Sequence, residues 1–357
     1  MVALAVAALP QHLINVAQAV LSEYVAPEVN CLIFDSDSTS NDYSSSMLGG
    51  SSSYLASILP HVKFTTVNRW ERISSVQNAW YVRRFSRNFD TQVLGIGDTG
   101  LWARSPIRRN GGRTVLVDDG ASSLKLPFSQ LLDDRAWLGD QVLYRRALHL
   151  AVGPVVRNAR DPEIYTAFPV EDSPWPVARH NYAELRSAVS QHPPEWVPNS
   201  DSGNILVDSG YALTLGREWF DWILPVAIHE WGVDCYIPHR RTPTSLVDWV
   251  KGEFGLAVIR PDVSMELLIG PWTKAGVNIY TPPAALAVTA RMFEESPGRV
   301  TAFRVSRWLE KQIDASQTGI SPRIERVLRN ALLVERHLEF EGILDAEPDE
   351  AGPSSKF

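Results

Sequence analysis

One short stretch of the chain combines a strong strand signal with two acids. The apolar run 114–117, with the sequence TVLV, leads directly into Asp118, Asp119 and Gly120. A buried parallel strand reads as an unbroken apolar run, and α/β sheets carry their chemistry where such strands end. Two adjacent carboxylates repel each other, so one of them can keep its proton and act as a base near neutral pH. The same acids also cap turns and helices well, and the residues alone leave both interpretations open.

Strand-like and helix-like patterns alternate on both sides of a proline-rich segment at 192–198. Before it, strands are expected near 1–9, 30–34, 62–67 and 91–94, with a helical apolar face from Leu13 to Tyr24. After it, strands are expected at 205–207, 234–237, 256–259, 267–269 and 277–280, and helices at 218–229, 244–251, 281–293 and from 322. This alternation predicts an α/β protein with two Rossmann-like domains. We place these domains at 1–195 and 200–335, before a disordered acidic tail at 345–357.

Composition excludes several classes of protein. A length of 357 residues suits two domains, and 45% hydrophobic with 21% charged residues is typical of a soluble globular chain. The net charge of −7 argues against a nucleic-acid binder. Cys31 and Cys235 each lie in an apolar run, which predicts two buried thiols. No apolar run is long enough to span a membrane and the N-terminus lacks a basic signal region, so we expect a cytoplasmic protein. Peripheral contact with a membrane and the oligomeric state stay open.

Two glycine-containing segments of the first half need separate interpretation. Residues 95–100, GIGDTG, match the dinucleotide-binding pattern, and Asp118 lies near the expected ribose-binding acid. Pro106 and the Asn110-Gly111-Gly112 turn leave too little room for the required helix, so a nicotinamide-dependent oxidoreductase is only a minor alternative. Residues 36–53, rich in serine and glycine, predict a mobile loop that either borders a binding crevice or has no role. No cluster has the spacing of metal ligands.

The predicted strands of the second half end in polar residues that suit an anionic ligand: Asp208, Ser209 and Gly210 after one, His239 and Arg240 after another, and Thr281 after a third. Thr281, followed by Pro282, is expected to cap the helix at 281–293, whose positive end suits a phosphate. A cap needs no ligand, so that alternative stands beside the first. Glu266 is either an acceptor for ribose hydroxyls or an exposed glutamate at a helix end.

Four motifs resemble those of bacterial sialyltransferases and polysialyltransferases. Residues 10–15 (PQHLIN) resemble the strand-to-helix opening of that family, and 117–120 (VDDG) look like its acid-acid-glycine motif. Residues 236–241 (YIPHRR) are similar to its histidine motif, and 279–286 lie where it keeps a serine/threonine motif at a helix start. The order and rough spacing of these motifs agree from about residue 5 to 330.

The resemblance implies a GT-B architecture, with two Rossmann-like domains facing each other across a cleft. It implies an inverting transfer of sialic acid, or a related nonulosonic acid, from a CMP-sugar to a glycan hydroxyl, without a cofactor or metal. Asp118 would be the base, with Asp208 as its rival, and Gly120 would let the backbone approach a ligand. His239 and Arg240 would meet the donor phosphate. The remaining donor contacts would come from Ser209, Gly210, Glu266 and Thr281.

Three features depart from the family pattern. Pro238 precedes His239 instead of following it, and Thr242-Pro243 replaces a glutamate that is often found there. The segment 283–285, Pro-Ala-Ala, stands where serines would help to hold the phosphate. These changes leave the donor open, so another sugar nucleotide remains an alternative. A non-catalytic nucleotide- or glycan-binding protein of the same fold is the competing class.

Overall fold

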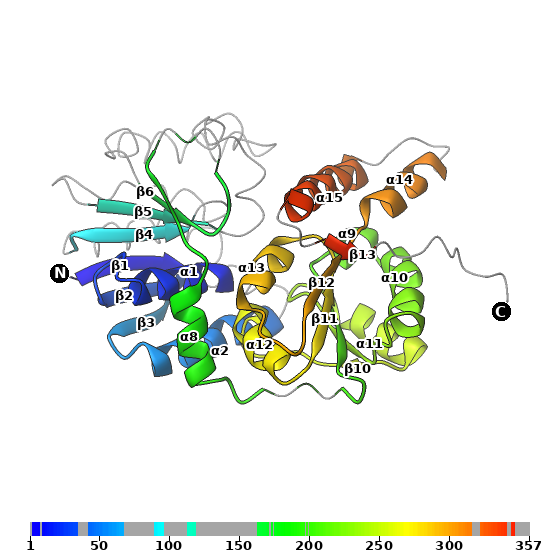
Figure 1. The fold of residues 1–357 in the computed structure, drawn as a ribbon, viewed down its shortest axis with the longest axis horizontal. Coiled ribbons are helices and arrows are strands. Elements are labelled where there is room, and N and C mark those ends of the chain that lie inside the picture. Colours follow the sequence, from blue (N-terminus) through cyan, green and yellow to red (C-terminus); the bar gives the residue numbers. More distant parts are fainter. Residues whose placement is uncertain are drawn as a thin grey trace. The chain divides into compact units, whose positions relative to one another are not determined.

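A computed structural model describes residues 2–7, 9–34, 42–67, 89–95, 113–118, 163–170, 173, 175–196, 198, 200–315, 322–340 and 344–346. The chain divides into two compact units. The first unit comprises Met1–His192 with Asp262–Ser264, and the second comprises Pro193–Pro261 with Met265–Phe357. Each unit is built on its own parallel sheet (Figure 1), so the chain has the α/β class expected from the alternation of its patterns.

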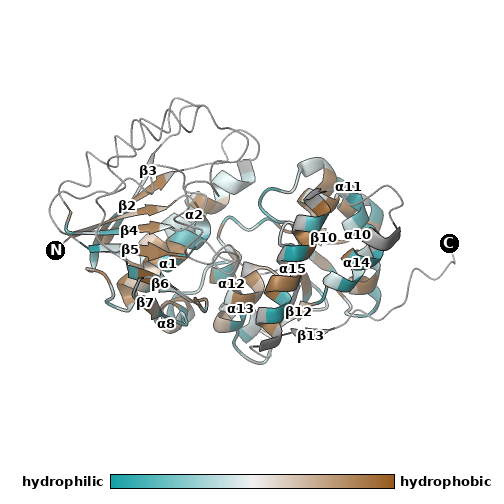
Figure 2. Cartoon of the chain, turned by 90° about the horizontal axis from the view of Figure 1, so that it is seen from above, coloured by the Kyte–Doolittle hydropathy of each residue, from teal (hydrophilic) through white to brown (hydrophobic). Residues whose placement is uncertain are grey.

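The described strands of the first unit form a seven-stranded sheet in the order β3-β2-β1-β4-β5-β6-β7, and every pair is parallel. Their bounds are β1 Val2–Ala7, β2 Glu28–Phe34, β3 Val62–Val67, β4 Thr91–Gly95, β5 Arg113–Val117, β6 Glu163–Thr166 and β7 Val177–Arg179. Figure 2 shows the hydrophobic colouring of β2, β4 and β5. The order reverses between β1 and β4, which makes that position the topological switch point of this sheet.

Three described helices accompany this sheet: α1 Pro10–Leu21, α2 Asp42–Ile58 and α8 Ala183–Gln191. Pro10 stands in the first turn of α1, where its missing N–H costs nothing. Helix α1 contacts both α2 and α8. Its apolar face, which includes Leu13, Val16 and Val20, is buried. Its polar side chains Gln11, Asn15 and Gln18 are buried as well.

The described strands of the second unit form a six-stranded parallel sheet in the order β10-β9-β8-β11-β12-β13. Their bounds are β8 Asn204–Val207, β9 Cys235–Ile237, β10 Ala257–Val258, β11 Asn278–Thr281, β12 Val300–Phe303 and β13 Leu344–Ala346. Its helices are α9 Ala212–Leu215, α10 Arg217–His229, α11 Thr244–Phe254, α12 Met265–Lys274, α13 Ala285–Phe293, α14 Ser306–Ala315 and α15 Pro322–Phe340. The order of the strands reverses between β8 and β11, which makes that position the topological switch point of this sheet.

Aromatic side chains dominate the core of the second unit. Trp219 of α10 is almost completely buried and stacks on Tyr211 with ring centroids 4.9 Å apart. It also packs against Phe303 of β12 and Trp308 of α14. Burial of a large aromatic ring contributes on the order of 3 kcal/mol. Tyr211 directly follows Gly210, so its stacking on Trp219 anchors the turn after β8 in this core.

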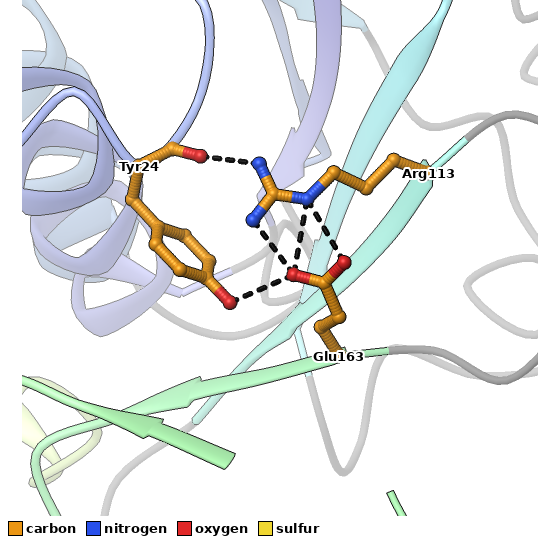
Figure 3. A network of polar contacts seen from close by, with 3 residues as sticks. All are labelled: Tyr24, Arg113 and Glu163. Atoms are coloured by element: carbon orange, nitrogen blue, oxygen red, sulfur yellow. Dashed lines mark hydrogen bonds and ion pairs between the residues drawn. The ribbon is translucent and has the colours of Figure 1, made fainter. Parts of the chain in front are cut away.

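An ion pair joins two strand starts of the first unit (Figure 3). The guanidinium Nη2 of Arg113 lies 2.7 Å from Oε2 of Glu163, and Nε donates to Oε1 over 3.1 Å. The Tyr24 hydroxyl donates to the same carboxylate over 2.8 Å, and the Tyr24 carbonyl accepts from Nη1. The Arg113 guanidinium holds the pKa of Glu163 below its usual range, despite the opposing effect of burial. This cluster joins the amino ends of β5 and β6 to the turn that follows α1.

Several expectations from the sequence are wrong. The loop expected at 36–53 is helical from Asp42 onward, because Tyr43, Met47, Leu48 and Leu55 form one buried face of α2. The apolar run 267–269 lies inside α12 and not in a strand, and residues 345–346 of the expected tail belong to β13.

The prediction of two buried thiols is confirmed. Cys31 and Cys235 are buried and unpaired, and burial raises the pKa of each thiol to about 12.

Candidate functional site

Two hydroxyls meet at the switch point of the second unit. Ser209 follows the carboxyl end of β8, and Thr281 is the last residue of β11. The Ser209 Oγ and the Thr281 Oγ1 lie 3.2 Å apart, and either can donate to the other. Thr281 is completely buried, whereas Ser209 is half-buried. In open α/β sheets ligands bind outside the carboxyl ends of strands at this position, so the pair marks a candidate binding site.

Thr281 does not have the role expected for it. The sequence predicts a helix cap at Thr281, but α13 begins at Ala285 and its N-cap residue is Ala284, without a side-chain cap. Thr281 instead completes β11, and its Oγ1 also approaches the Pro282 carbonyl at 3.4 Å. The prediction of a capping threonine is wrong because β11 continues one residue further than expected. The hydroxyl nevertheless lies at the edge where it was expected to act.

Gly210 brings the backbone close to the imidazole of His239. Its φ of +90° is a conformation that glycine adopts easily and other residues rarely do. A Cβ atom at this position would lie 3.5 Å from the His239 ring, so the ring packs directly over the turn. The turn that follows β8 and the turn that follows β9 therefore meet beside Ser209.

The imidazole of His239 has a defined orientation. Its Nδ1 accepts the N–H of Arg241 over 3.3 Å, and its carbonyl accepts the N–H of Thr242 over 2.8 Å. Because Nδ1 is an acceptor, a neutral ring carries its proton on Nε2, which can donate to an anion. Arg240 is half-buried beside it, on the same turn. These groups suit a phosphate better than an apolar ligand.

Asp208 lies beneath the Ser209–Gly210 turn. Its Oδ1 accepts the N–H of Gly210 over 3.2 Å, and its Oδ2 accepts the hydroxyl of Tyr236 over 3.2 Å. Burial raises the pKa of Asp208 to about 6, although these donors act in the opposite direction. Asp208 therefore shapes the turn and is also a titratable acid in this cluster.

Glu266 belongs to a helix and not to one of these turns. It is half-buried in the first turn of α12, whereas Ser209, Gly210, His239 and Thr281 follow or complete strands. Helix α12 contacts β11 and α13. The structure thus brings four of the expected donor residues together and places Glu266 on a neighbouring helix.

In the first unit, Asp118 is completely buried at the carboxyl end of β5. The Nδ2 of Asn15, from α1, donates to Oδ1 of Asp118 over 3.1 Å and to its carbonyl over 2.7 Å. The backbone N–H of Ala167, just after β6, donates to Oδ2 over 3.2 Å. The carboxylate thus connects α1, β5 and β6. Gly120 and residues 96–100 of the glycine motif lie outside the described residues.

Sequence reasoning missed His12 and Gly95, which meet at the switch point of the first unit. Gly95 ends β4, and a Cβ atom there would lie 2.4 Å from Nε2 and Cε1 of the His12 ring. No side chain larger than hydrogen fits without a shift of that ring. A signal was present in the sequence, because a strand that ends in glycine indicates a close approach. In the sequence the same glycine is also the first residue of the dinucleotide pattern 95–100, which supports only a minor alternative.

Within the described ranges, no group of three histidine, cysteine, aspartate or glutamate residues could hold a metal ion. None of the helices in that same part of the chain is long and apolar enough to cross a bilayer.

Comparisons with known proteins agree with the fold and go no further. No protein-family profile and no curated protein matches the chain. S. aureus MnaA, solved with UDP, has a TM-score of 0.51 at 12% identity, over 98% of this chain and 100% of that one. MurG from Acinetobacter baumannii is also similar, with a TM-score of 0.45 at 12% identity over 99% of this chain and 87% of that one. A family 9 glycosyl transferase from Veillonella parvula has a TM-score of 0.39 at 11% identity over 94% of this chain and 97% of that one. The two parallel sheets and the first of these structures define a pair of Rossmann-like domains of the GT-B type.

Proposed function

We propose that this chain is a glycosyltransferase that takes its sugar from a nucleotide donor bound by the second unit. The observation that carries the proposal is the meeting of Ser209, Gly210, His239 and Thr281 at the carboxyl ends of β8, β9 and β11. The half-buried Ser209 hydroxyl and an imidazole N–H can donate to a phosphate oxygen, while the completely buried Thr281 hydroxyl bonds to Ser209 and positions it. The fold shared with MnaA, which was solved with UDP, supports a nucleotide as the ligand.

The proposed reaction is an inverting transfer. The acceptor hydroxyl loses its proton to Asp118 while its oxygen forms a bond to the anomeric carbon of the sugar. The bond from that carbon to the phosphate oxygen breaks, and the phosphate leaves with the electron pair. His239 and Arg240 neutralise the charge that develops on this leaving group. Removal of a general base or of such a donor lowers turnover by ~10²–10⁴-fold.

For the donor, we propose CMP-activated sialic acid or a related nonulosonic acid, transferred to a glycan hydroxyl. Its support is the resemblance of residues 117–120 and 236–241 to the sialyltransferase motifs. A uridine nucleotide is the second candidate, favoured by the UDP in the S. aureus structure. A protein that binds the nucleotide without catalysis is the remaining alternative, and product formation separates it from an enzyme.

The test is a thermal-shift panel of cytidine, uridine, guanosine and nicotinamide nucleotides, followed by product analysis with the donors that bind. A cytidine or uridine nucleotide should raise the melting temperature, and Ser209→Ala should weaken its binding several-fold. Ser202→Ala is the matched control, because Ser202 is an exposed serine just before the amino end of the same strand. Stabilisation by nicotinamide nucleotides alone would refute the proposal.

A further inference from the structure

Helix α1 carries a buried polar face. Gln11, Asn15 and Gln18 follow one another at spacings of four and three residues, so they lie on one side of the helix. The exposed fraction is 8% for Gln11 and 0% for the other two. A buried amide without partners costs ~1–3 kcal/mol, so the bonds that these side chains make define what the face does.

Two of these amides belong to a chain of hydrogen bonds that ends on Asp118. The Nε2 of Gln11 donates to the Tyr182 hydroxyl over 2.8 Å, and this hydroxyl donates to Oδ1 of Asn15 over 2.5 Å. The Nδ2 of Asn15 then donates to Oδ1 of Asp118 over 3.1 Å. All donors point the same way, toward the carboxylate. Because Oδ1 of Asn15 is committed to the tyrosine, its Nδ2 must face Asp118.

The backbone of Tyr182 is strained. It is completely buried with a φ of +56°, in the left-handed region that a residue with a side chain adopts at a cost of ~1–2 kcal/mol. It stands at the N-cap position of α8 but makes no side-chain cap bond there. Its hydroxyl instead reaches Asn15. Such backbone strain is retained where the surrounding contacts need the side chain in that position.

Gln18, the third amide of this face, makes different contacts. The Nε2 of Gln18 donates to Glu184 over 2.5 Å and to the Tyr165 hydroxyl over 3.4 Å, and its Oε1 accepts the N–H of Leu185 over 3.0 Å. This branch attaches α8 to α1 and does not reach Asp118. The same helix face thus holds one branch that ends on the acid and one that serves packing, which provides a matched control.

We propose that Asn15 and Tyr182 are positioning residues for Asp118, which they hold in the orientation needed to take the proton of the acceptor hydroxyl. Asn15 fixes Oδ1 while the Ala167 N–H fixes Oδ2, so the plane of the carboxylate is determined. The inference rests on the proposed function, in which Asp118 is the base. It adds a way for residues that touch no substrate to control the rate of transfer.

The experiment compares Tyr182→Phe with Tyr165→Phe. Each change removes one buried hydroxyl that bonds to an amide of α1, but only the first belongs to the chain that ends on Asp118. With CMP-sialic acid, or UDP-N-acetylglucosamine if the uridine nucleotide binds, Tyr182→Phe should lower kcat about tenfold with KM unchanged. Tyr165→Phe should leave kcat within about twofold, because the Tyr165 hydroxyl bonds to Gln18 and lies outside the chain of hydrogen bonds that ends on Asp118. Wild-type kcat in Tyr182→Phe would overturn the inference.

A double-mutant cycle with Asp118→Asn separates positioning from a general effect on folding. If Tyr182 acts through Asp118, Tyr182→Phe should change kcat no further once the base is absent. An equal fall in both backgrounds would show a merely structural role. If Tyr182→Phe does not unfold cooperatively, Gln11→Met tests the other end of the chain, and an unchanged kcat there counts equally against the inference.

The outcomes also distinguish this inference from the proposed function. Turnover that falls in Asp118→Asn but not in Tyr182→Phe refutes the positioning role alone. Wild-type turnover in a folded Asp118→Asn variant, or no turnover with any donor, refutes the proposed reaction and the inference with it.

Discussion

The hydroxyls of Ser209 and Thr281 lie 3.2 Å apart, although the two residues are separated by 72 positions in the sequence. They meet because β8 and β11 are neighbours in the sheet, while β9 and β10 extend it on the other side of β8. Thr281 is the last residue of β11, whereas Ser209 lies in the turn just after β8, so the buried strand-end hydroxyl holds the hydroxyl of the turn. A phosphate bound beside Ser209 would therefore meet a hydroxyl whose position is already fixed.

Replacement of Gly210 tests whether the backbone of this turn matters for binding. Gly210→Ala forces a side chain into a φ of +90°, and should cost ~1–2 kcal/mol of stability and weaken nucleotide binding. Gly255→Ala is the control, because Gly255 has a φ of +66° at the end of α11 with nothing near a new Cβ atom. Both variants should lose stability, and only Gly210→Ala should lose affinity in calorimetric titrations. Equal affinity in the two would remove the turn from the site.

His239→Ala should weaken nucleotide binding by ~1.5–3 kcal/mol, the value of a charge-assisted hydrogen bond from the ring to a phosphate. The free energy of unfolding should change less, because the ring is only half-buried. His229→Ala is the control, since His229 is exposed at the end of α10. Titration with CMP and UDP measures the effect. Unchanged affinity for both nucleotides would contradict the role of the ring.

Asp208 makes stability depend on pH. Burial raises its pKa to about 6 from an ordinary value of 3.8, so the folded protein binds this proton more tightly than the unfolded chain. The free energy of unfolding contributed by this group therefore falls as pH rises through that interval, and stays lower above it. Asp208→Asn should be more stable than wild type by ~1–3 kcal/mol at neutral pH, with the difference vanishing near pH ~4. Denaturant unfolding at several pH values measures it, and a constant difference would contradict the shift.

Glu163→Gln should lower the free energy of unfolding by ~0.5–1 kcal/mol, because Glu163 and Arg113 are partly exposed. The loss should shrink at high salt, where the wild-type ion pair is screened. Tyr24→Phe keeps the ion pair and removes only one bond to the carboxylate, so it should be milder and independent of salt. Urea unfolding at two ionic strengths distinguishes the variants. An equal, salt-independent loss in both would assign the stabilisation to packing.

Transfer should continue in the presence of EDTA, because the proposed mechanism neutralises the phosphate with His239 and Arg240 and needs no divalent ion. Product formation is measured with and without the chelator, and with magnesium or manganese added back. Complete loss of activity that either ion restores would make a metal part of the reaction. In that case Asp118 and Asp119 would be reassigned as its ligands.

Sequence alone determined the elements whose patterns are local. Strands β1, β2, β8, β9 and β11 lie within one or two residues of their expected positions or inside them, because a buried parallel strand requires an apolar run. The polar residues that end these strands could likewise be named in advance, since parallel strands place them at one edge. The local prediction that failed is the loop at 36–53, where the helical period of the apolar residues was overlooked. The serine-rich run at 42–58 forms α2 because its few large apolar residues share one helical face, which composition alone did not reveal.

Only the tertiary structure decided which of these residues meet. Three contacts depend on which strands or helices become neighbours: Ser209 with Thr281, His12 with Gly95, and Asn15 with Asp118. Neighbours in a parallel sheet are set by crossover connections and by the burial of whole faces, and neither leaves a mark at a single position. Hydrophobic periodicity therefore determined most of the described strands and helices, whereas the order of neighbouring elements within each unit determined which polar residues meet at the edge of its sheet.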